Sequence, residues 1–105
     1  MMKDIFKKLI KFRDQRDWKQ FHTPANLAKS ISIEAAELLE CFQWNDEYES
    51  DNVQQELADI IIYCLLMTEA LGVDFEDIVN EKIEINTKKY PVEKARGNSK
   101  KANKL

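Results

Sequence analysis

The sequence predicts an all-α fold, a four-helix antiparallel bundle followed by a basic C-terminal tail. Its 105 residues are enough for one domain. Two glycines and two prolines are fewer than the turns of an all-β sandwich or a glycine-rich nucleotide-binding α/β fold require. Apolar residues recur at helical spacing in four segments. Short connections between such segments favour an antiparallel bundle.

The first two helices are predicted from their apolar spacing and their ends. The first covers about 4–17, with apolar residues on one side and lysines opposite. The second begins at Thr23 and Pro24, because threonine is a good N-cap and proline suits the first helical position. It is expected to end near Phe42. Residues 44–51 lack an apolar period and are expected to form a loop.

The third and fourth helices are predicted in the same way. The third covers about 51–71, with Gln54 in a capping-box arrangement at its start and Gly72 suited to a left-handed C-cap. The fourth covers about 74–89, because acidic residues suit its first turn and Pro91 stops it.

Charge is divided unevenly along the chain. The net charge is −3, but residues 92–105 carry five basic side chains and one acidic, whereas residues 1–91 carry 11 basic and 18 acidic. We expect residues 1–91 to form the domain and residues 92–105 to be a flexible basic tail. The alternative is that the tail contacts an anionic ligand held by the body. The acidic body argues against nucleic acid as a partner.

Targeting and cysteine signals predict a cytoplasmic protein without a membrane partner. The N-terminus lacks the apolar segment of a signal peptide, and the apolar run 60–67 is too short to span a bilayer. Cys41 and Cys64 fall in helical patterns and are expected to be reduced core residues. A single histidine excludes a multi-histidine zinc site within one chain.

Two pairs of acidic residues border apolar helix faces. Glu56 and Asp59 share a narrow sector of an otherwise apolar helix. Glu34 and Glu37 are placed similarly on the preceding helix, whereas Glu40 falls on the solvent side. Antiparallel packing would bring the two pairs together, and a hard cation such as Mg²⁺, with Mn²⁺ as a substitute, would relieve their repulsion. The alternative is that these acids pair with lysines at the bundle rim.

Three further groups are candidates, each with a structural alternative. His22 precedes a helix and is a capping or packing residue, or a ligand contact. Trp44 belongs to the core or rim, or offers a surface on which a base stacks. Lys82, Asn86 and Lys89 share one helix face, which is either a solvated polar face or a row of phosphate donors.

Together these residues resemble the MazG-like superfamily of all-α nucleoside triphosphate pyrophosphohydrolases, most closely its dCTP pyrophosphatase branch. Glu34 and Glu37, followed by Glu56 and Asp59, match the E-x-x-E…E-x-x-D signature of that superfamily. The resemblance covers roughly residues 12–101. Other matching segments are 12–13, 16–18, 21–27, 42–44, 82–83, 86, 89–91 and 96–97.

The resemblance implies a Mg²⁺-dependent enzyme of nucleotide-pool house-cleaning. It would convert a nucleoside triphosphate, dCTP or a modified dCTP, to the monophosphate and pyrophosphate. The resemblance also implies site residues. The metal ligands would be Glu34, Glu37, Glu56 and Asp59, with Glu37 and Glu56 catalytic. The substrate-binding residues would be His22, Asn26, Trp44, Tyr63, Lys82, Asn86 and Tyr90.

The chain is expected to form a homo-oligomer. Ile61, Ile62, Leu65 and Leu66 span opposing sectors of the third helix, more than a lone bundle covers. The resemblance implies a tetramer built as a dimer of dimers, in which His22 or Trp44 reaches a neighbour's carboxylates. Two other functions stay open: a non-catalytic helical interaction module, and the same fold acting on dUTP or another nucleotide.

Overall fold

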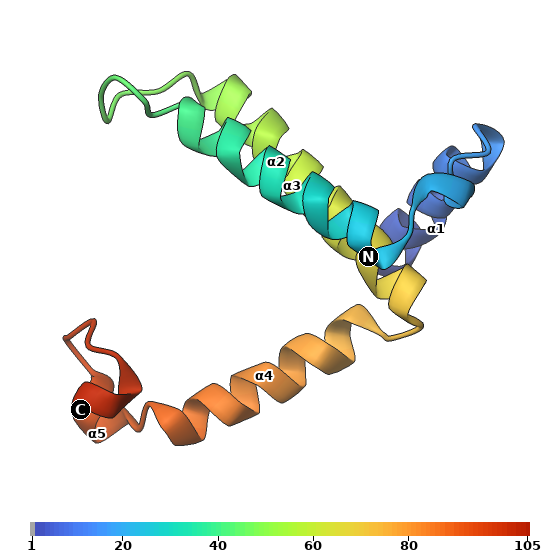
Figure 1. Ribbon diagram of the computed structural model, residues 1–105. Helices are drawn as coiled ribbons and strands as arrows, with labels where there is room; N and C mark the ends of the chain where they lie inside the picture. Colours follow the sequence, from blue (N-terminus) through green and yellow to red (C-terminus); the bar gives the residue numbers. More distant parts are fainter. Residues whose placement is uncertain (1) are drawn as a thin grey trace. The chain divides into compact units, whose positions relative to one another are not determined.

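The computed structural model describes residues 2–105, and these contain helices and no β-strand (Figure 1). The all-α prediction and its four substantial helices are therefore confirmed. In chain order the helices are α1 (Met2–Gln15), the 3-10 helix η1 (Lys19–Phe21), α2 (Pro24–Glu40), α3 (Ser50–Leu71), α4 (Phe75–Lys89), α5 (Val92–Ala95) and the 3-10 helix η2 (Ala102–Lys104).

The chain divides into two compact units after Gly72. The first unit holds α1, α2 and α3, and the second, Val73–Leu105, holds α4, α5 and η2. Since α4 belongs to the second unit, closure of the four helices into one bundle stays a prediction. So does the assignment of residues 1–91 to one domain. The segment 92–105, expected to be a flexible tail, contains the two short helices α5 and η2.

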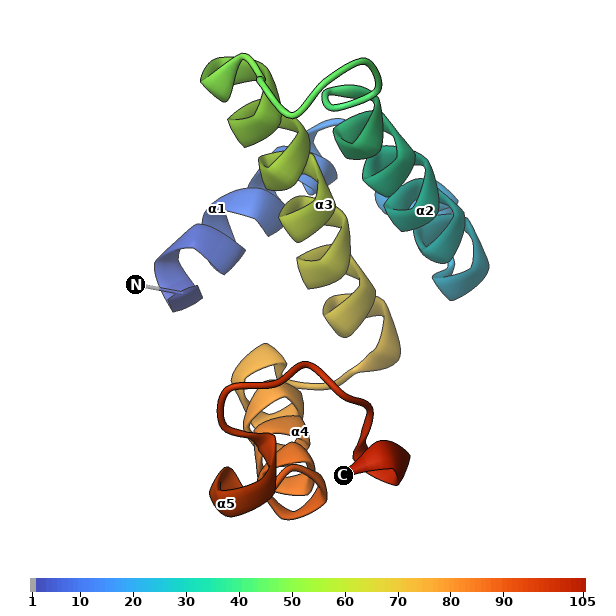
Figure 2. The same ribbon diagram turned by 90° about the vertical axis from the view of Figure 1, so that its left-hand side faces the viewer.

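In the first unit α3 lies between α1 and α2 (Figure 2). The main contact is between α2 and α3, which run side by side and are joined by a short connection. Leu27 of α2 and Leu65 and Leu66 of α3 are buried and form the apolar centre of this packing. The antiparallel pairing of α2 and α3 sets two acid-bearing helices against each other.

Helix ends with strong local signals form as predicted. The Thr23 hydroxyl oxygen accepts a hydrogen bond from the Asn26 N–H, and Pro24 is the first residue of α2. An Asp74 carboxylate oxygen accepts from the Asp77 N–H at the start of α4. Gly72 ends α3 with φ 67°, in the left-handed region that favours glycine.

Four predicted boundaries were wrong by one or two residues, and the first of these is the start of α1, at Met2 instead of residue 4. The helix α1 ends at Gln15 instead of residue 17, and α2 ends at Glu40 instead of Phe42. The helix α3 begins at Ser50 instead of residue 51, and its N-cap Glu49 makes no side-chain cap. The predicted capping box does not form, and the Gln54 amide donates to the Ser50 hydroxyl. Helix ends of this kind fray and lack a dominant local signal.

Much apolar surface of the first unit is exposed. Ile61 and Ile62 of α3 are exposed, whereas Leu65 and Leu66 are buried, so packing within the unit covers only part of the apolar circumference of this helix. Leu39 of α2 is 71% exposed. Other exposed large apolar residues on α2 and α3 are Ile33, Leu57 and Leu71. An apolar surface of this extent is typical of an interface.

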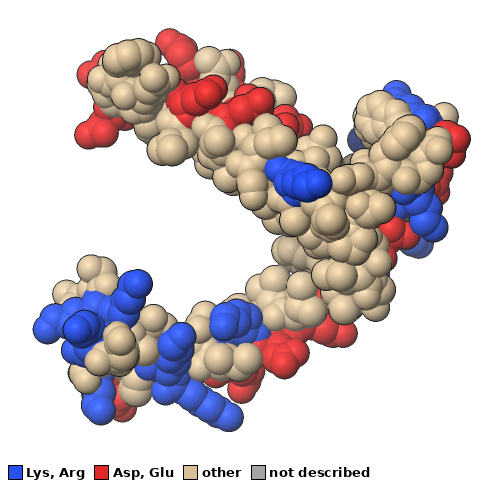
Figure 3. Space-filling model, in the orientation of Figure 1, with Lys and Arg blue, Asp and Glu red and all other residues tan. Residues whose placement is uncertain are grey.

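Charge follows the sequence pattern, whereas the cysteines follow it only in part. Acidic side chains gather around the connection between α2 and α3, and basic side chains gather over the C-terminal part of the second unit (Figure 3). Cys41 and Cys64 are free thiols, but they are half-buried instead of lying in the core as predicted. Among the described residues, no helix has both the length and the apolar character that crossing a bilayer requires.

Candidate functional site

Three carboxylates from two helices meet in the first unit. Glu34 projects from α2, and Glu56 and Asp59 project from α3. One oxygen atom of each carboxylate lies within 4.8 Å of the corresponding oxygens of the other two. The packing of α2 against α3 thus brings these predicted site residues together. We call these three residues the carboxylate cluster.

The carboxylate cluster is not neutralised by basic residues. Within residues 2–105, the ion pairs to acidic groups are those of Arg13 with Asp14 and Glu69, and none involves the cluster. One oxygen each of Glu34 and Glu56 is buried without a hydrogen-bond partner. The alternative that these acids pair with lysines at the bundle rim is therefore not what the described structure contains.

Burial and mutual repulsion change the acidity of the cluster. Burial, followed by the neighbouring carboxyls of Glu37, Glu56 and Asp59, raises the pKa of Glu34 to about 7. Burial is also the first cause that raises the pKa of Glu56 above its usual value. In the metal-free protein, closely spaced carboxylates cannot all remain charged without a cost in free energy.

The donor set fits a hard divalent cation. All three groups offer oxygen, and the cluster contains no cysteine or histidine. Carboxylate oxygens without nitrogen or sulfur ligands suit Mg²⁺ or Mn²⁺ rather than Zn²⁺. A cation here would also pair with the buried, unpartnered oxygens of Glu34 and Glu56. The carboxylate cluster therefore offers the oxygen donors that a hard divalent cation prefers.

Glu37 lies beside the cluster without joining it. It is exposed, one turn after Glu34 on α2, and its carboxyl helps to raise the pKa of both Glu34 and Glu56. Its carboxylate is not among the three that come within 4.8 Å of one another. Glu37 is thus placed near the predicted metal ligands but open to solvent.

A cavity of about 230 Å³ adjoins the carboxylate cluster. Asp59 belongs to both, and the predicted site residues His22 and Tyr63 line the cavity with it. Phe12 and Trp18 form an aromatic wall, with ring centroids 5.7 Å apart in an edge-to-face arrangement. The cavity therefore has aromatic side chains on one wall and lies next to the carboxylate cluster.

Sequence reasoning missed three residues of this cavity, Phe12, Arg13 and Trp18. Trp18 lies in the segment 16–18, which matches the family, but it was not assigned to the site. A tryptophan four residues before His22, between two helices, was the signal that could have identified it. Arg13 lies in the matching segment 12–13, but nothing in the helical pattern of charged residues indicated that its side chain is only 2% exposed.

Two predicted substrate residues of the first unit do not join the cavity. Trp44 is 85% exposed and follows α2, whereas His22 precedes it. The 17 residues of α2 rise about 1.5 Å each, so the two ends of the helix lie about 25 Å apart. Asn26 donates its side-chain amide to the Phe21 carbonyl and its N–H to Thr23, so both groups stabilise the start of α2.

The three remaining predicted substrate residues belong to the second unit. Lys82 and Asn86 are exposed on α4, and Tyr90 is half-buried at its C-cap. The Tyr90 N–H donates to the Asn86 carbonyl at 2.8 Å, and the Lys89 ammonium lies 6.0 Å from the centroid of the Tyr90 ring. Their part in a site stays a prediction.

Comparison with known proteins decides the family. A family model described as MazG-like matches residues 29–105. The chain belongs to the MazG-like family. It is similar to dCTP pyrophosphatase 1 of Homo sapiens, with 34% identity over 99% of this chain and 67% of that protein. The corresponding Mus musculus protein is 33% identical over 93% of this chain and 64% of its own length. This chain therefore spans about two thirds of these relatives.

A solved structure supports the same family. The crystal structure of a pyrophosphatase from Archaeoglobus fulgidus DSM 4304 matches with a TM-score of 0.80 and 40% sequence identity. The match covers 86% of this chain and 92% of that one. The resemblance seen in the sequence is thus confirmed by both sequence and structure.

The raised pKa of Glu34 predicts how metal-free stability depends on pH. Because its folded pKa of about 7 exceeds the usual 4.5, its stabilising contribution is full below pH 4.5 and is lost as pH rises through 7. Raising the pH from 6 to 8 in chelator should lower the Tm of the wild type by a few degrees more than that of Glu34→Gln. His22 is common to both proteins, so its own titration cancels. Equal pH dependence in the two would contradict the prediction.

Proposed function

We propose that this chain is a Mg²⁺-dependent nucleoside triphosphate pyrophosphohydrolase that acts on dCTP or a modified dCTP. The observation that carries the proposal is an unneutralised carboxylate cluster sharing Asp59 with an aromatic-walled cavity. Membership of the MazG-like family and similarity to dCTP pyrophosphatases support it. House-cleaning of the nucleotide pool is the corresponding role, and we place the enzyme in the cytoplasm.

The carboxylates would have two roles, to bind the cation and to activate the attacking water. Glu34, Glu56 and Asp59 would hold the cation, and Glu37 would complete the ligand set from the solvent side. When bound, Mg²⁺ would supply positive charge that neutralises the triphosphate and makes a water at the site more acidic. Glu37 and Glu56 orient the attacking water, and a Glu37 carboxylate oxygen takes its proton. The water oxygen bonds to the α-phosphorus, the bond from that phosphorus to the α–β bridging oxygen breaks, and pyrophosphate leaves with that oxygen.

The cavity is our candidate for the base pocket. Phe12 and Trp18 present aromatic faces, and stacking of a base on such a face contributes about 1–3 kcal/mol. His22 has a buried ring nitrogen without a partner, which suits hydrogen bonding to the edge of a base. Tyr63 lines the same cavity, about one turn after Asp59 on α3, and is our candidate for the sugar-side neighbour. Lys82, Asn86 and Tyr90 would bind phosphates or sugar.

Nucleotide hydrolysis and carboxylate variants test this function. With Mg²⁺, the wild type should release dCMP and pyrophosphate from dCTP, faster than from dUTP, dTTP, dATP or dGTP at equal concentration. Glu56→Ala and Asp59→Ala should each lower turnover by more than about a hundredfold, since even outer partners of metal ligands contribute about 10–100-fold. Their folds should be intact, because each change removes a repulsive charge.

Glu40→Ala is the matched control, because it removes an exposed acid of α2 outside the cluster. It should retain wild-type turnover. Near-wild-type turnover in Glu56→Ala or Asp59→Ala would contradict the site. Absence of hydrolysis with every nucleotide and with either Mg²⁺ or Mn²⁺ would favour a helical interaction module instead.

We propose further that the working unit is a homo-oligomer, a tetramer built as a dimer of dimers. Two observations support an assembly. The first unit leaves apolar residues such as Leu39, Ile61 and Ile62 exposed. Trp44 lies about 25 Å from the His22 end of α2, so a pocket that uses both residues needs Trp44 from a second copy. The active site would then be shared between chains.

Sedimentation at low micromolar concentration tests the assembly. The main species should have about four times the monomer mass of 12.3 kDa. Leu39→Asp should shift it toward smaller species, because the charge would be buried in an apolar interface. Trp44→Ala chains should bind dCTP weakly, and mixing them with inactive Glu56→Ala chains should raise the activity at low dCTP above that of either variant alone. A stable 12.3 kDa species with full activity would exclude both the oligomer and the shared site.

A further inference from the structure

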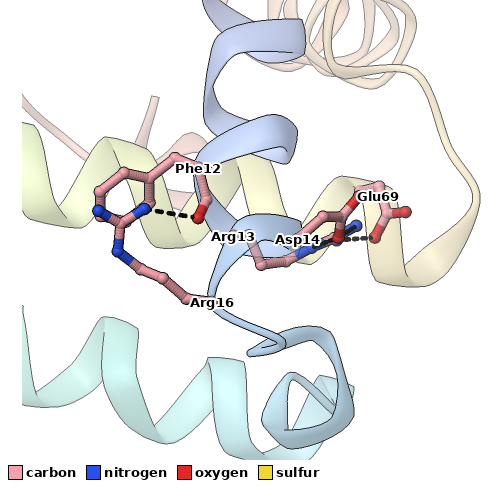
Figure 4. Close-up of polar contacts among 5 residues, drawn as sticks. All are labelled: Phe12, Arg13, Asp14, Arg16 and Glu69. Atoms are coloured by element: carbon pink, nitrogen blue, oxygen red, sulfur yellow. Dashed lines mark hydrogen bonds and ion pairs between the residues drawn. The ribbon is translucent and has the colours of Figure 1, made fainter.

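Arg13 is a charged residue placed inside the first unit, at 2% exposure. Its Nη1 donates to Glu69 Oε2 at 2.7 Å, and its Nε donates to Asp14 Oδ1 at 2.9 Å (Figure 4). Glu69 belongs to α3, whereas Asp14 is the neighbour of Arg13 on α1. Only the contact with Glu69 therefore joins two helices.

The main chain of Arg13 also fixes the start of the segment 16–23, which joins α1 to α2. Its carbonyl accepts hydrogen bonds from the Arg16 N–H and the Trp18 N–H, each at 3.2 Å. The Arg16 guanidinium in turn lies 3.8 Å from the centroid of the Phe12 ring and donates to the Phe12 carbonyl (Figure 4). Arg13 thus contacts α3 through its side chain and positions Trp18 through its backbone carbonyl.

Arg13 itself lines the cavity, together with Trp18, His22 and Phe12. Four of the lining residues therefore depend on where the end of α1 sits against α3. Asp59 and Tyr63 of α3 form the opposite side of the same cavity. The contact between Arg13 and Glu69 is the polar link between these two sides.

A contribution to folding stability does not by itself explain the buried ion pair of Arg13 and Glu69. Replacing a buried ion pair by apolar residues of similar size is often neutral or stabilising, whereas removing one partner leaves a buried charge. The exposed partner Asp14, 53% accessible at its side chain, adds little. A buried arginine with one interhelical partner at the edge of a cavity is better explained by what it positions.

We propose that Arg13 is a positioning residue of the nucleotide site: held by Glu69, it fixes the cavity wall that carries Trp18 and His22 against α3. The proposal rests on the proposed function and deepens it. Arg13 acts through these two residues and sets how well the cavity receives the base, while the carboxylate cluster acts on the triphosphate.

The charge of Arg13 acts on His22 in a way that supports this role. Burial first, and then the positive charge of Arg13, lower the pKa of His22 below its usual 6.5, while Glu69 opposes them. The other titratable groups that line the cavity are Asp59 and Tyr63 of α3. Burial and Arg13 thus favour a neutral imidazole, which keeps one acceptor nitrogen for a base.

The test compares two variants that each remove one negative charge beside the same guanidinium. Glu69→Gln should raise KM for dCTP about tenfold with kcat within about twofold, because base binding is weakened equally in the ground and transition states. Inhibition by inorganic tripolyphosphate, which has no base, should be unchanged. Asp14→Asn, the matched control, should change neither quantity, because Asp14 does not join α1 to α3.

His22 provides a second readout, because it is the single histidine of the chain and gives one imidazole NMR signal. Its titration midpoint should fall in Glu69→Gln and rise in Arg13→Gln, since the two partners act on it with opposite signs. General loosening of the fold would move both midpoints toward 6.5 and would overturn the proposal.

The KM of Glu69→Gln is the second measurement that can overturn the proposal. A folded Glu69→Gln protein with the KM of Asp14→Asn would overturn the proposal. If Glu69→Gln does not fold, the double variant Arg13→Met with Glu69→Met removes both charges and should fold with the raised KM. If the wild type hydrolyses no nucleotide, the proposed function fails. The positioning role is then decided by dCTP affinity in calorimetry, with a drop of about tenfold expected for Glu69→Gln only.

Discussion

The packing of α2 against α3 is the contact on which the site depends. It buries Leu27, Leu65 and Leu66, and the same contact holds Glu34 against Glu56 and Asp59. Hydrophobic burial thereby forces like charges to within 4.8 Å, with two carboxylate oxygens left without a partner. The metal-free protein relieves part of this repulsion by raising the pKa of Glu34. A divalent cation would relieve it while all the carboxylates stay charged.

The first unit buries few apolar side chains, and this small core bears on both the site and oligomer formation. Much apolar surface of α2 and α3 remains exposed after the two helices have packed. In the proposed oligomer, a second copy of the chain would cover that surface and bring its exposed Trp44 to the site of the first. Stability and activity would then have the same concentration dependence, because both need the interface.

The sequence was most informative where the signal is local. Thr23, Asp74 and Gly72 mark helix ends through their own side-chain or backbone preferences, and all three helix ends form as expected. The start of α3 was placed one residue late, because Glu49 provides no side-chain cap. The pairing of Glu34 with Glu56 and Asp59 was predictable as well, since helical spacing places each acid beside an apolar face that must be buried.

What the sequence did not indicate depends on contacts between elements. Arg13 resembles any other charged residue of α1 until α3 supplies Glu69. Trp18 becomes part of a cavity only when the end of α1 is fixed against α3. The distance between His22 and Trp44 was implicit in the length of α2, yet it has meaning only once the position of the cavity is known.

The Tm of the metal-free protein with increasing Mg²⁺ tests the central claim most directly, that the cluster of α2 and α3 is a cation site. A cation that binds the folded chain raises the Tm by mass action. The account predicts a saturable rise in the wild type and in Glu40→Gln, and none in Glu56→Gln. A wild-type Tm that stays constant up to about 10 mM Mg²⁺, well above the concentrations at which a specific site saturates, would contradict it.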